Sequence, residues 1–275
     1  MIQLKLDSKL QARIGPLAGS FHMALDRFVY ESELSEPVLR LYWFERPCLT
    51  FGISQRPGEL LADKLPEGLD FSLRISGGKC LLHESGLTYT FAWPRKSFPE
   101  LEGLVPSYKV LTELILESLK SFDSKLKMQC DSKFQEKTNP VCFLEHNVET
   151  ISREGAKIVG SAQKRGRKNC LQHGEIRLFD TETSLGNSLK SGQVEEFEEA
   201  SIERIGSLFN RSVENCSSLF EARQEVASQL LKGFQKRFGK SRENSLESTL
   251  VREVQEYQKL LHIPLGEQPA KEVCP

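Results

Sequence analysis

The stretch RISGGKCLLHESGLTYTF, residues 74–91, places two adjacent glycines between two segments that alternate in polarity. The segments FSLRIS (71–76) and LTYTFAW (87–93) both alternate with a period of two, which is typical of half-buried β-strands. Adjacent glycines after a strand either form a hairpin turn or let the backbone approach a ligand, to which their N–H groups donate. Arg74 stands just before Gly77 and Gly78, where a guanidinium can bind a carboxylate or a phosphate. The spacing matches neither a P-loop nor a GxGxxG motif.

Strand-like patterns dominate the chain up to about residue 180, and helical patterns dominate after it. Further strands are expected near 1–10, 38–44, 147–151, 157–161 and 175–179, and helices over 21–29, 107–122, 222–239 and 250–261. This order predicts an α+β fold with a mixed sheet, flanking helices and a helical C-terminal part. We expect one catalytic domain over 1–240, with a C-terminal helix and tail (241–275) packed on it. The polar stretch 241–248 is the only candidate linker.

Composition excludes several classes of function. The 275 residues carry a net charge of -1, which gives no field that favours nucleic acid or an anionic membrane. Neither a signal peptide nor a run of apolar residues long enough to span a membrane is present, so we expect a cytoplasmic protein. The seven cysteines contain no CxxC pair, and with five scattered histidines they offer no zinc-ligand spacing. Each cysteine is therefore a small hydrophobic residue unless another pattern marks it as reactive.

A second informative stretch is GAKIVGSAQKRGRKNCLQHGEI, residues 155–176. Lys157 lies on a predicted strand among apolar residues, so its ammonium is either at a hairpin edge on the surface or in a partly desolvated place. In the second case it can stabilise an oxyanion or lower the pKa of a nearby thiol. The basic loop Lys164–Lys168 is either solvated or meets an acidic partner. His173 and Gly174 form a possible second polar anchor.

Together these stretches resemble the superfamily of lipoate–protein ligases, octanoyltransferases and biotin–protein ligases. FHMALDRF (21–28) looks like the family's N-terminal helix, and LRLYWFERPCLTFGISQ (39–55) is similar to its strand ending in glycine and glutamine. RISGGKCLLHESGLTYTF is similar to the family's glycine-loop motif, and KIVGSAQKR (157–165) to the segment that bears its lysine. Two positions depart from the pattern: Lys79 replaces a third glycine, and Glu84 replaces an aspartate.

The resemblance implies a biotin/lipoate ligase type of catalytic domain and a set of site residues. Lys157 matches the family's lysine and is expected to be catalytic. The implied substrate-binding residues are Arg74, Gly77, Gly78, His83, Gly160, Ser161, His173 and Gly174. No metal ligand is implied.

Within the superfamily, Cys142 distinguishes among the possible reactions. One type of octanoyltransferase carries its nucleophile after the His-Gly motif, but the stretch that follows Gly174 here contains no cysteine until Cys216. Another type carries a Cys-Phe dipeptide before the strand with the lysine. Cys142-Phe143 matches that type, 15 residues before Lys157 and 18 before Gly160. Cys142 is therefore expected to be the catalytic nucleophile, with Cys80 in the glycine loop as its rival.

The implied function is transfer of an octanoyl or lipoyl group to the lysine of a lipoyl domain through a Cys142 thioester. The expected donor is the octanoyl-phosphopantetheine of acyl carrier protein. Expected acceptors include the glycine cleavage H protein and the E2 component of 2-oxoacid dehydrogenases, and no cofactor is required. The alternatives are an ATP- and Mg-dependent lipoate–protein ligase acting through a lipoyl-adenylate, or a lipoyl amidotransferase. The substitutions at Lys79 and Glu84 also leave a non-catalytic relative open.

Overall fold

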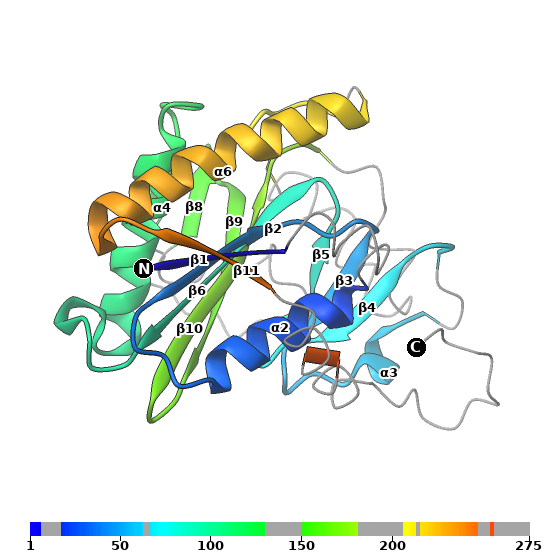
Figure 1. Cartoon of the computed structure of the whole chain (residues 1–275). Helices are drawn as coiled ribbons and strands as arrows, with labels where there is room; N and C mark the ends of the chain where they lie inside the picture. The colour runs from blue at the N-terminus through cyan, green and yellow to red at the C-terminus, as the bar shows by residue number, and fades with distance from the viewer. Residues whose placement is uncertain are drawn as a thin grey trace.

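The computed structural model describes residues 1–6, 18–62, 66–129, 150–180, 206–212, 215–246 and 254–255 (Figure 1). Within these residues, strands form one large sheet in the order β11-β1-β2-β6-β10-β9-β8-β7 and a small one in the order β4-β3-β5. The strands are β1 Ile2–Leu6, β2 Val38–Tyr42, β3 Cys48–Phe51, β4 Asp70–Leu73, β5 Leu81–His83, β6 Gly86–Pro94, β7 Lys127–Gln129, β8 Thr150–Arg153, β9 Ala156–Arg165, β10 Asn169–Arg177 and β11 Arg242–Leu246. The helices are α2 Gly19–Glu31, α3 Pro57–Leu60, η1 Pro99–Leu101, α4 Leu104–Leu119 and α6 Cys216–Phe238. The mixed α+β fold agrees with the expectation from sequence.

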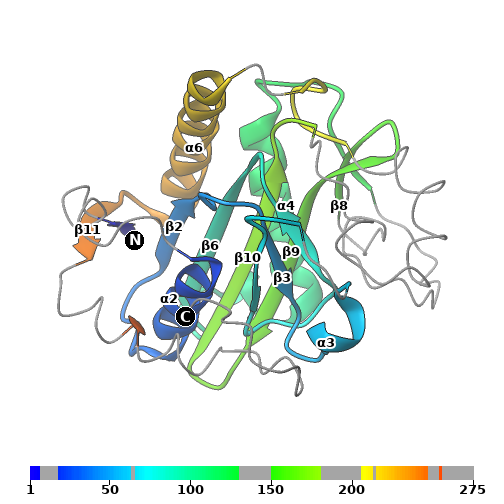
Figure 2. The ribbon, with the colours of Figure 1, turned by 90° about the vertical axis from the view of Figure 1, so that its right-hand side faces the viewer.

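Strands β6 and β10 form the centre of the large sheet. They pair antiparallel from Gly86↔Arg177 to Asn169↔Pro94. Nearly every residue on both strands is buried, because α4 and α6 cover one face while α2 and the small sheet lie on the other (Figures 1 and 2). Alternate side chains of these strands therefore enter two different cores. This arrangement explains why LTYTFAW is apolar on one side and carries Thr88 and Thr90 on the other.

The two glycines do not form the hairpin turn that their sequence context also allowed. In the small sheet β3 is the central strand, with β4 parallel on one side and β5 antiparallel on the other. The segment between β4 and β5 must therefore pass across β3, which makes it a crossover loop. We call this connecting segment, residues 74–80, the glycine loop.

The C-terminal part of the chain differs from expectation in one respect. Residues 242–246, within the stretch predicted as a linker, form β11 and pair in parallel with β1 from Ile2↔Arg242 to Leu6↔Leu246. A polar edge strand has no apolar alternation, which is why the sequence pattern missed it. The helix expected over 250–261 lies outside the described residues except for Val254 and Gln255.

Helix α6 shows the expected helical periodicity and capping. Asn215 and Ser218 form a reciprocal capping box at its start, and Gly239 (φ 92°) ends it. Every fourth residue along the inner face is buried, including Leu230 and Phe234. Across the described residues, no helix is both long enough and apolar enough to cross a membrane.

Replacement of Phe234 by alanine is expected to lower the free energy of unfolding by about 3–5 kcal/mol, because a buried aromatic side chain leaves a cavity. Phe234 is fully buried, and its ring centroid lies 5.0 Å from that of Phe91. Phe220, on the same helix, is 51% exposed and serves as the matched control. Its alanine variant should lose about 1 kcal/mol or less. Denaturant unfolding measures both, and equal losses would contradict the packing described here.

Candidate functional site

A pocket lies where the small sheet meets strands β6, β9 and β10. Six of the eight residues predicted to bind substrate line it, although they come from four different strands and loops. The lining residues are Met23, Tyr42, Arg74, Leu81, His83, Thr88, Gly160, Ser161, Ala162, His173 and Gly174.

The two remaining predicted substrate-binding residues, Gly77 and Gly78, are connected to the pocket through Arg74. The Nη2 group of Arg74 donates to the carbonyls of Gly77 (3.2 Å) and Lys79 (2.6 Å). A Cβ atom on Gly78 (φ 90°) would lie 3.3 Å from the same nitrogen. A Cβ on Gly77 would meet nothing within 4 Å, so that side of the loop is open. The glycine loop thus lies beside the pocket with its backbone accessible.

The guanidinium of Arg74 is hydrogen-bonded to other groups of the protein. Besides these two carbonyls, its Nη1 group donates to the carbonyl (2.7 Å) and hydroxyl (3.0 Å) of Thr50. Arg74 is 4% exposed, and its guanidinium was expected to bind a carboxylate or phosphate. Through these four hydrogen bonds the guanidinium holds the glycine loop against Thr50.

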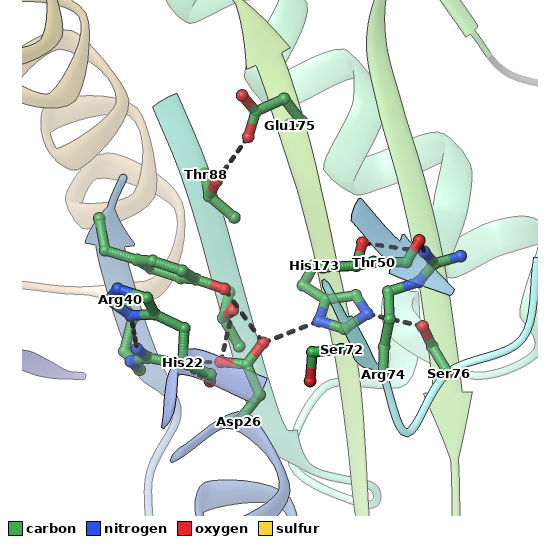
Figure 3. Close-up of polar contacts among 12 residues, drawn as sticks. His22, Asp26, Arg40, Thr50, Ser72, Arg74, Ser76, Thr88, His173 and Glu175 are labelled. Atoms are coloured by element: carbon green, nitrogen blue, oxygen red, sulfur yellow. Dashed lines mark hydrogen bonds and ion pairs between the residues drawn. The ribbon is translucent and has the colours of Figure 1, made fainter. Parts of the chain in front are cut away.

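A buried carboxylate, Asp26 of α2, joins the helix to three strands of the large sheet. Asp26 pairs with Arg40 and accepts hydrogen bonds from Tyr42 (3.3 Å), Thr90 (2.8 Å) and Nδ1 of His173 (2.8 Å; Figure 3). Burial opposes its charge, but the Arg40 guanidinium and the His173 hydrogen bond together hold the pKa of Asp26 below its usual range. Loss of one partner from such a buried pair costs about 3–5 kcal/mol.

A second buried carboxylate, Glu175, lies on β10 two residues after His173. Its Oε2 atom accepts hydrogen bonds from His83 Nδ1 (2.8 Å) and Thr88 Oγ1 (2.5 Å). The other nitrogen of His83 lies 2.8 Å from Thr50 Oγ1, and the ring stacks on Phe44 at 4.2 Å. Room for the carboxylate exists because residue 86 is glycine, where a Cβ would lie 1.7 Å from Glu175 Oε1.

Lys157 is buried, as one of its two sequence interpretations required. It is 1% exposed, lies near the start of β9 and pairs across the ladder with Ser152 of β8. It does not belong to the pocket lining, and on its strand it precedes Gly160 by three residues. A surface position at a hairpin edge is excluded by this burial.

Cys142, the other predicted catalytic residue, lies outside the described residues. Its rival Cys80 is fully buried, as are Cys48 and Cys170. Burial raises the pKa of the Cys48 thiol well above its ordinary value, with the Asp70 charge adding to the effect. Cys216 is exposed, but it begins α6 on the other side of the sheet from the small sheet.

Sequence reasoning missed Asp26, Glu175 and Thr50, whose side chains hold the pocket residues. A signal existed for two of them. Asp26 interrupts the helical apolar face formed by Phe21, Leu25 and Val29, and it is buried together with them. Glu175 alternates with His173 on one face of β10. Thr50 offered no signal, because threonine is ordinary on a strand. Among the described residues, no group of three or more His, Cys, Asp or Glu could hold a metal ion.

Comparison with protein families gives one match over most of the chain. The model of the lipoyl protein ligase A/B catalytic domain matches residues 18–239.

Curated proteins similar to this chain include octanoyltransferase LipM from three bacteria. The chain is 34% identical to that of Kyrpidia tusciae over 175 residues, which cover 60% of this chain and 64% of the relative. The identity to that of Staphylococcus aureus is 32% over 202 residues, or 66% and 72% of the two chains. The match to that of Carboxydothermus hydrogenoformans is longer, at 29% over 232 residues, or 80% and 83%. The matched region therefore spans slightly less than two thirds of the Kyrpidia tusciae relative and more of the other two.

Solved structures with a similar fold include two lipoate–protein ligases. A bi-partite lipoate protein ligase from Thermoplasma acidophilum superposes with a TM-score of 0.70 at 16% identity, covering 94% of this chain and 91% of that one. A lipoate-protein ligase A bound with ATP gives a TM-score of 0.70 at 16% identity, covering 94% of each chain. At these identities the likeness is one of fold.

Stability of this region should depend on pH through His22, which stacks on Tyr42 at 4.6 Å. Burial, and then the Arg40 charge, lower the pKa of His22 from 6.5 to about 3. Between those values the unfolded chain takes up a proton that the folded chain refuses, so stability falls as pH falls from 6.5. His22→Gln should remove up to about 1.4 kcal/mol per pH unit from this slope. Denaturant unfolding between these pH limits measures it, and equal slopes in the two proteins would contradict a buried neutral His22.

Proposed function

Since the chain belongs to the lipoyl protein ligase A/B catalytic domain family, we propose that it transfers an octanoyl (or lipoyl) group to the lysine of a lipoyl domain through a thioester on Cys142. The similarity to bacterial octanoyltransferases carries this proposal. The Cys142-Phe143 dipeptide ahead of the Lys157 strand supports the choice of a cysteine-dependent transfer over adenylation.

The reaction consists of two acyl transfers. The Cys142 thiolate attacks the carbonyl carbon of an octanoyl thioester on the phosphopantetheine of acyl carrier protein. The carbon–sulfur bond to the donor breaks, and the donor thiol leaves with a proton. The ε-amine of the acceptor lysine then attacks the octanoyl-cysteine, an amide forms, and the Cys142 thiol is released. A thiolate suits both steps, because it is a strong nucleophile in the first and a good leaving group in the second.

An activated acyl donor removes the need for ATP. The thioester already holds the acyl group in reactive form, and conversion of a thioester to an amide is favourable. In this proposal ATP and Mg take no part, and no other cofactor is required. They would enter only in the ligase reaction, where free lipoate must first be adenylated.

Lys157 and the glycine loop would stabilise the oxyanion that develops during both attacks. Lys157 is 1% exposed, and in such a low-dielectric place the charge of an ammonium interacts with an oxyanion more strongly than it does in water. A Cβ on Gly77 would meet nothing within 4 Å, so there is room beside the loop for an acyl group whose oxygen accepts from its N–H groups. Lys157 would also favour the thiolate form of a cysteine brought near it.

The basic loop offers a docking place for an acidic acyl carrier protein. Lys164 and Arg167 lie at the hairpin between β9 and β10, where Arg167 is exposed. Arg165 in the same loop donates to Ser107 (2.9 Å) and to the Leu101 carbonyl (3.3 Å), so it stiffens the hairpin against α4 and η1. Complementary charge at such a patch mainly speeds association.

Intact mass after incubation with octanoyl-acyl carrier protein tests the proposal. The wild type should gain one octanoyl group, Cys142→Ala should gain none, and Cys80→Ala should behave as the wild type because Cys80 is fully buried. Addition of a lipoyl domain should then remove the group from the wild type and octanoylate the domain.

Three results would contradict the proposal, each in a different way. An adduct that survives Cys142→Ala and is lost in Cys80→Ala moves the nucleophile into the glycine loop. Absence of an adduct, together with lipoate-dependent ATP–pyrophosphate exchange, indicates a ligase. An adduct that forms with lipoylated or octanoylated lipoyl domains as donors, but not with octanoyl-acyl carrier protein, indicates an amidotransferase.

A further inference from the structure

Both histidines of the pocket have both ring nitrogens engaged with other residues of the chain. His173 connects Asp26 (2.8 Å) to Ser76 (2.6 Å), as Figure 3 shows. His83 connects Glu175 to Thr50, with both distances 2.8 Å. Neither ring keeps a nitrogen for a substrate, so what the histidines do follows from what they connect.

The hydrogen bonds around His83 have one consistent direction. An ionised Glu175 only accepts, so Nδ1 of His83 carries the proton and donates to it. In the neutral ring Nε2 then accepts, and the hydroxyl of Thr50 supplies the proton. That hydroxyl oxygen in turn receives the N–H of Arg74 at 3.0 Å. The chain of bonds therefore starts at a buried cation and ends at a buried anion, and the hydroxyl of Thr50 and both ring nitrogens of His83 each meet a partner of the matching kind.

The cationic end of this chain holds the glycine loop. Arg74 is fixed by Thr50 on one side and donates to the Gly77 and Lys79 carbonyls on the other. On the opposite side the loop touches Gly52, where a Cβ would lie 2.0 Å from the Gly78 carbonyl oxygen. The backbone of the loop is thus held between an arginine fork and a glycine contact. At position 79 Arg74 bonds to the backbone carbonyl and not to the side chain. The lysine that replaces the family's glycine there therefore does not disturb this hydrogen bond.

We propose that Glu175, acting through His83 and Thr50, is a positioning residue that fixes Arg74 and thereby the backbone of the glycine loop. His83 is a link in this chain and not an acid or base toward substrate. In catalysis the fixed loop would present the Gly77 and Gly78 amides to an acyl oxygen, and this role rests on the proposed function. The positioning itself does not depend on that function.

The matched pair Thr50→Val and Thr50→Ser tests the middle link of this chain of hydrogen bonds. Thr50 is fully buried, valine keeps its volume without the hydroxyl, and serine keeps the hydroxyl without the methyl group. Hydrogen exchange of the folded protein should be about tenfold faster in peptides covering the glycine loop for Thr50→Val, and within about twofold of wild type for Thr50→Ser. Peptides from α6 should be unchanged in both.

Kinetics supply the functional arm. In octanoyl transfer, Thr50→Val should lower kcat about tenfold with KM changed less than about threefold, and Thr50→Ser should restore kcat. If no variant, including wild type, transfers octanoate while the loop still loosens in Thr50→Val, the proposed function fails and the positioning stands. If wild type is active but loop exchange is the same in Thr50→Val, or if Thr50→Ser is as impaired as Thr50→Val, the positioning fails.

A measurement on the wild type keeps the proposal testable if Thr50→Val does not fold. Two-bond proton–nitrogen NMR of ¹⁵N-histidine-labelled protein distinguishes the two neutral tautomers of His83 and the charged ring. The Nδ1–H tautomer supports the chain as drawn. The Nε2–H tautomer would overturn it, because Glu175 would then face a bare nitrogen. A charged ring would also overturn it, because Nε2 would then donate to Thr50 instead of accepting from it.

Discussion

The buried carboxylate of Asp26 is the interaction on which the site depends. It is fully buried, and four groups satisfy it: Arg40 and Tyr42 on β2, Thr90 on β6 and His173 on β10. A charge removed from water is tolerated only when such partners surround it, so their positions are fixed relative to α2. Through His173 the constraint reaches Ser76 in the glycine loop. The helix, the centre of the sheet and the loop are therefore held in one arrangement.

A large share of this architecture could be predicted from sequence, because the relevant patterns are local. Period-two alternation located β4 and β6, and other strand-like segments located β2 and parts of β9 and β10. The four-residue apolar repeat with Gly239 located α6. Six of the eight expected binding residues line one pocket, because motifs from separate segments follow the order of a known family. The crossover of the glycine loop over β3 was not predictable in this way, since the pairing of β3 with both β4 and β5 is not local.

The roles of the polar residues were harder to predict than their presence. Arg74 and the two histidines were assigned to substrate, yet their hydrogen bonds connect parts of the chain. Sequence spacing shows which residue types occur together but not which donor meets which acceptor. Glu175 illustrates the difference: the space for its carboxylate depends on Gly86, which is distant in sequence and lies diagonally across the ladder, opposite Arg177. Lys157, by contrast, is buried as its apolar neighbours indicated.

The central claim is that an octanoyl group is carried on Cys142 and is held at this pocket. A crystal structure of the chain after reaction with octanoyl-acyl carrier protein tests it most directly. We expect continuous electron density from Cys142 Sγ through a thioester, with the carbonyl oxygen near the glycine loop and the Lys157 ammonium. Octanoyl density joined to another residue, or located away from the pocket between the small sheet and β10, would contradict it.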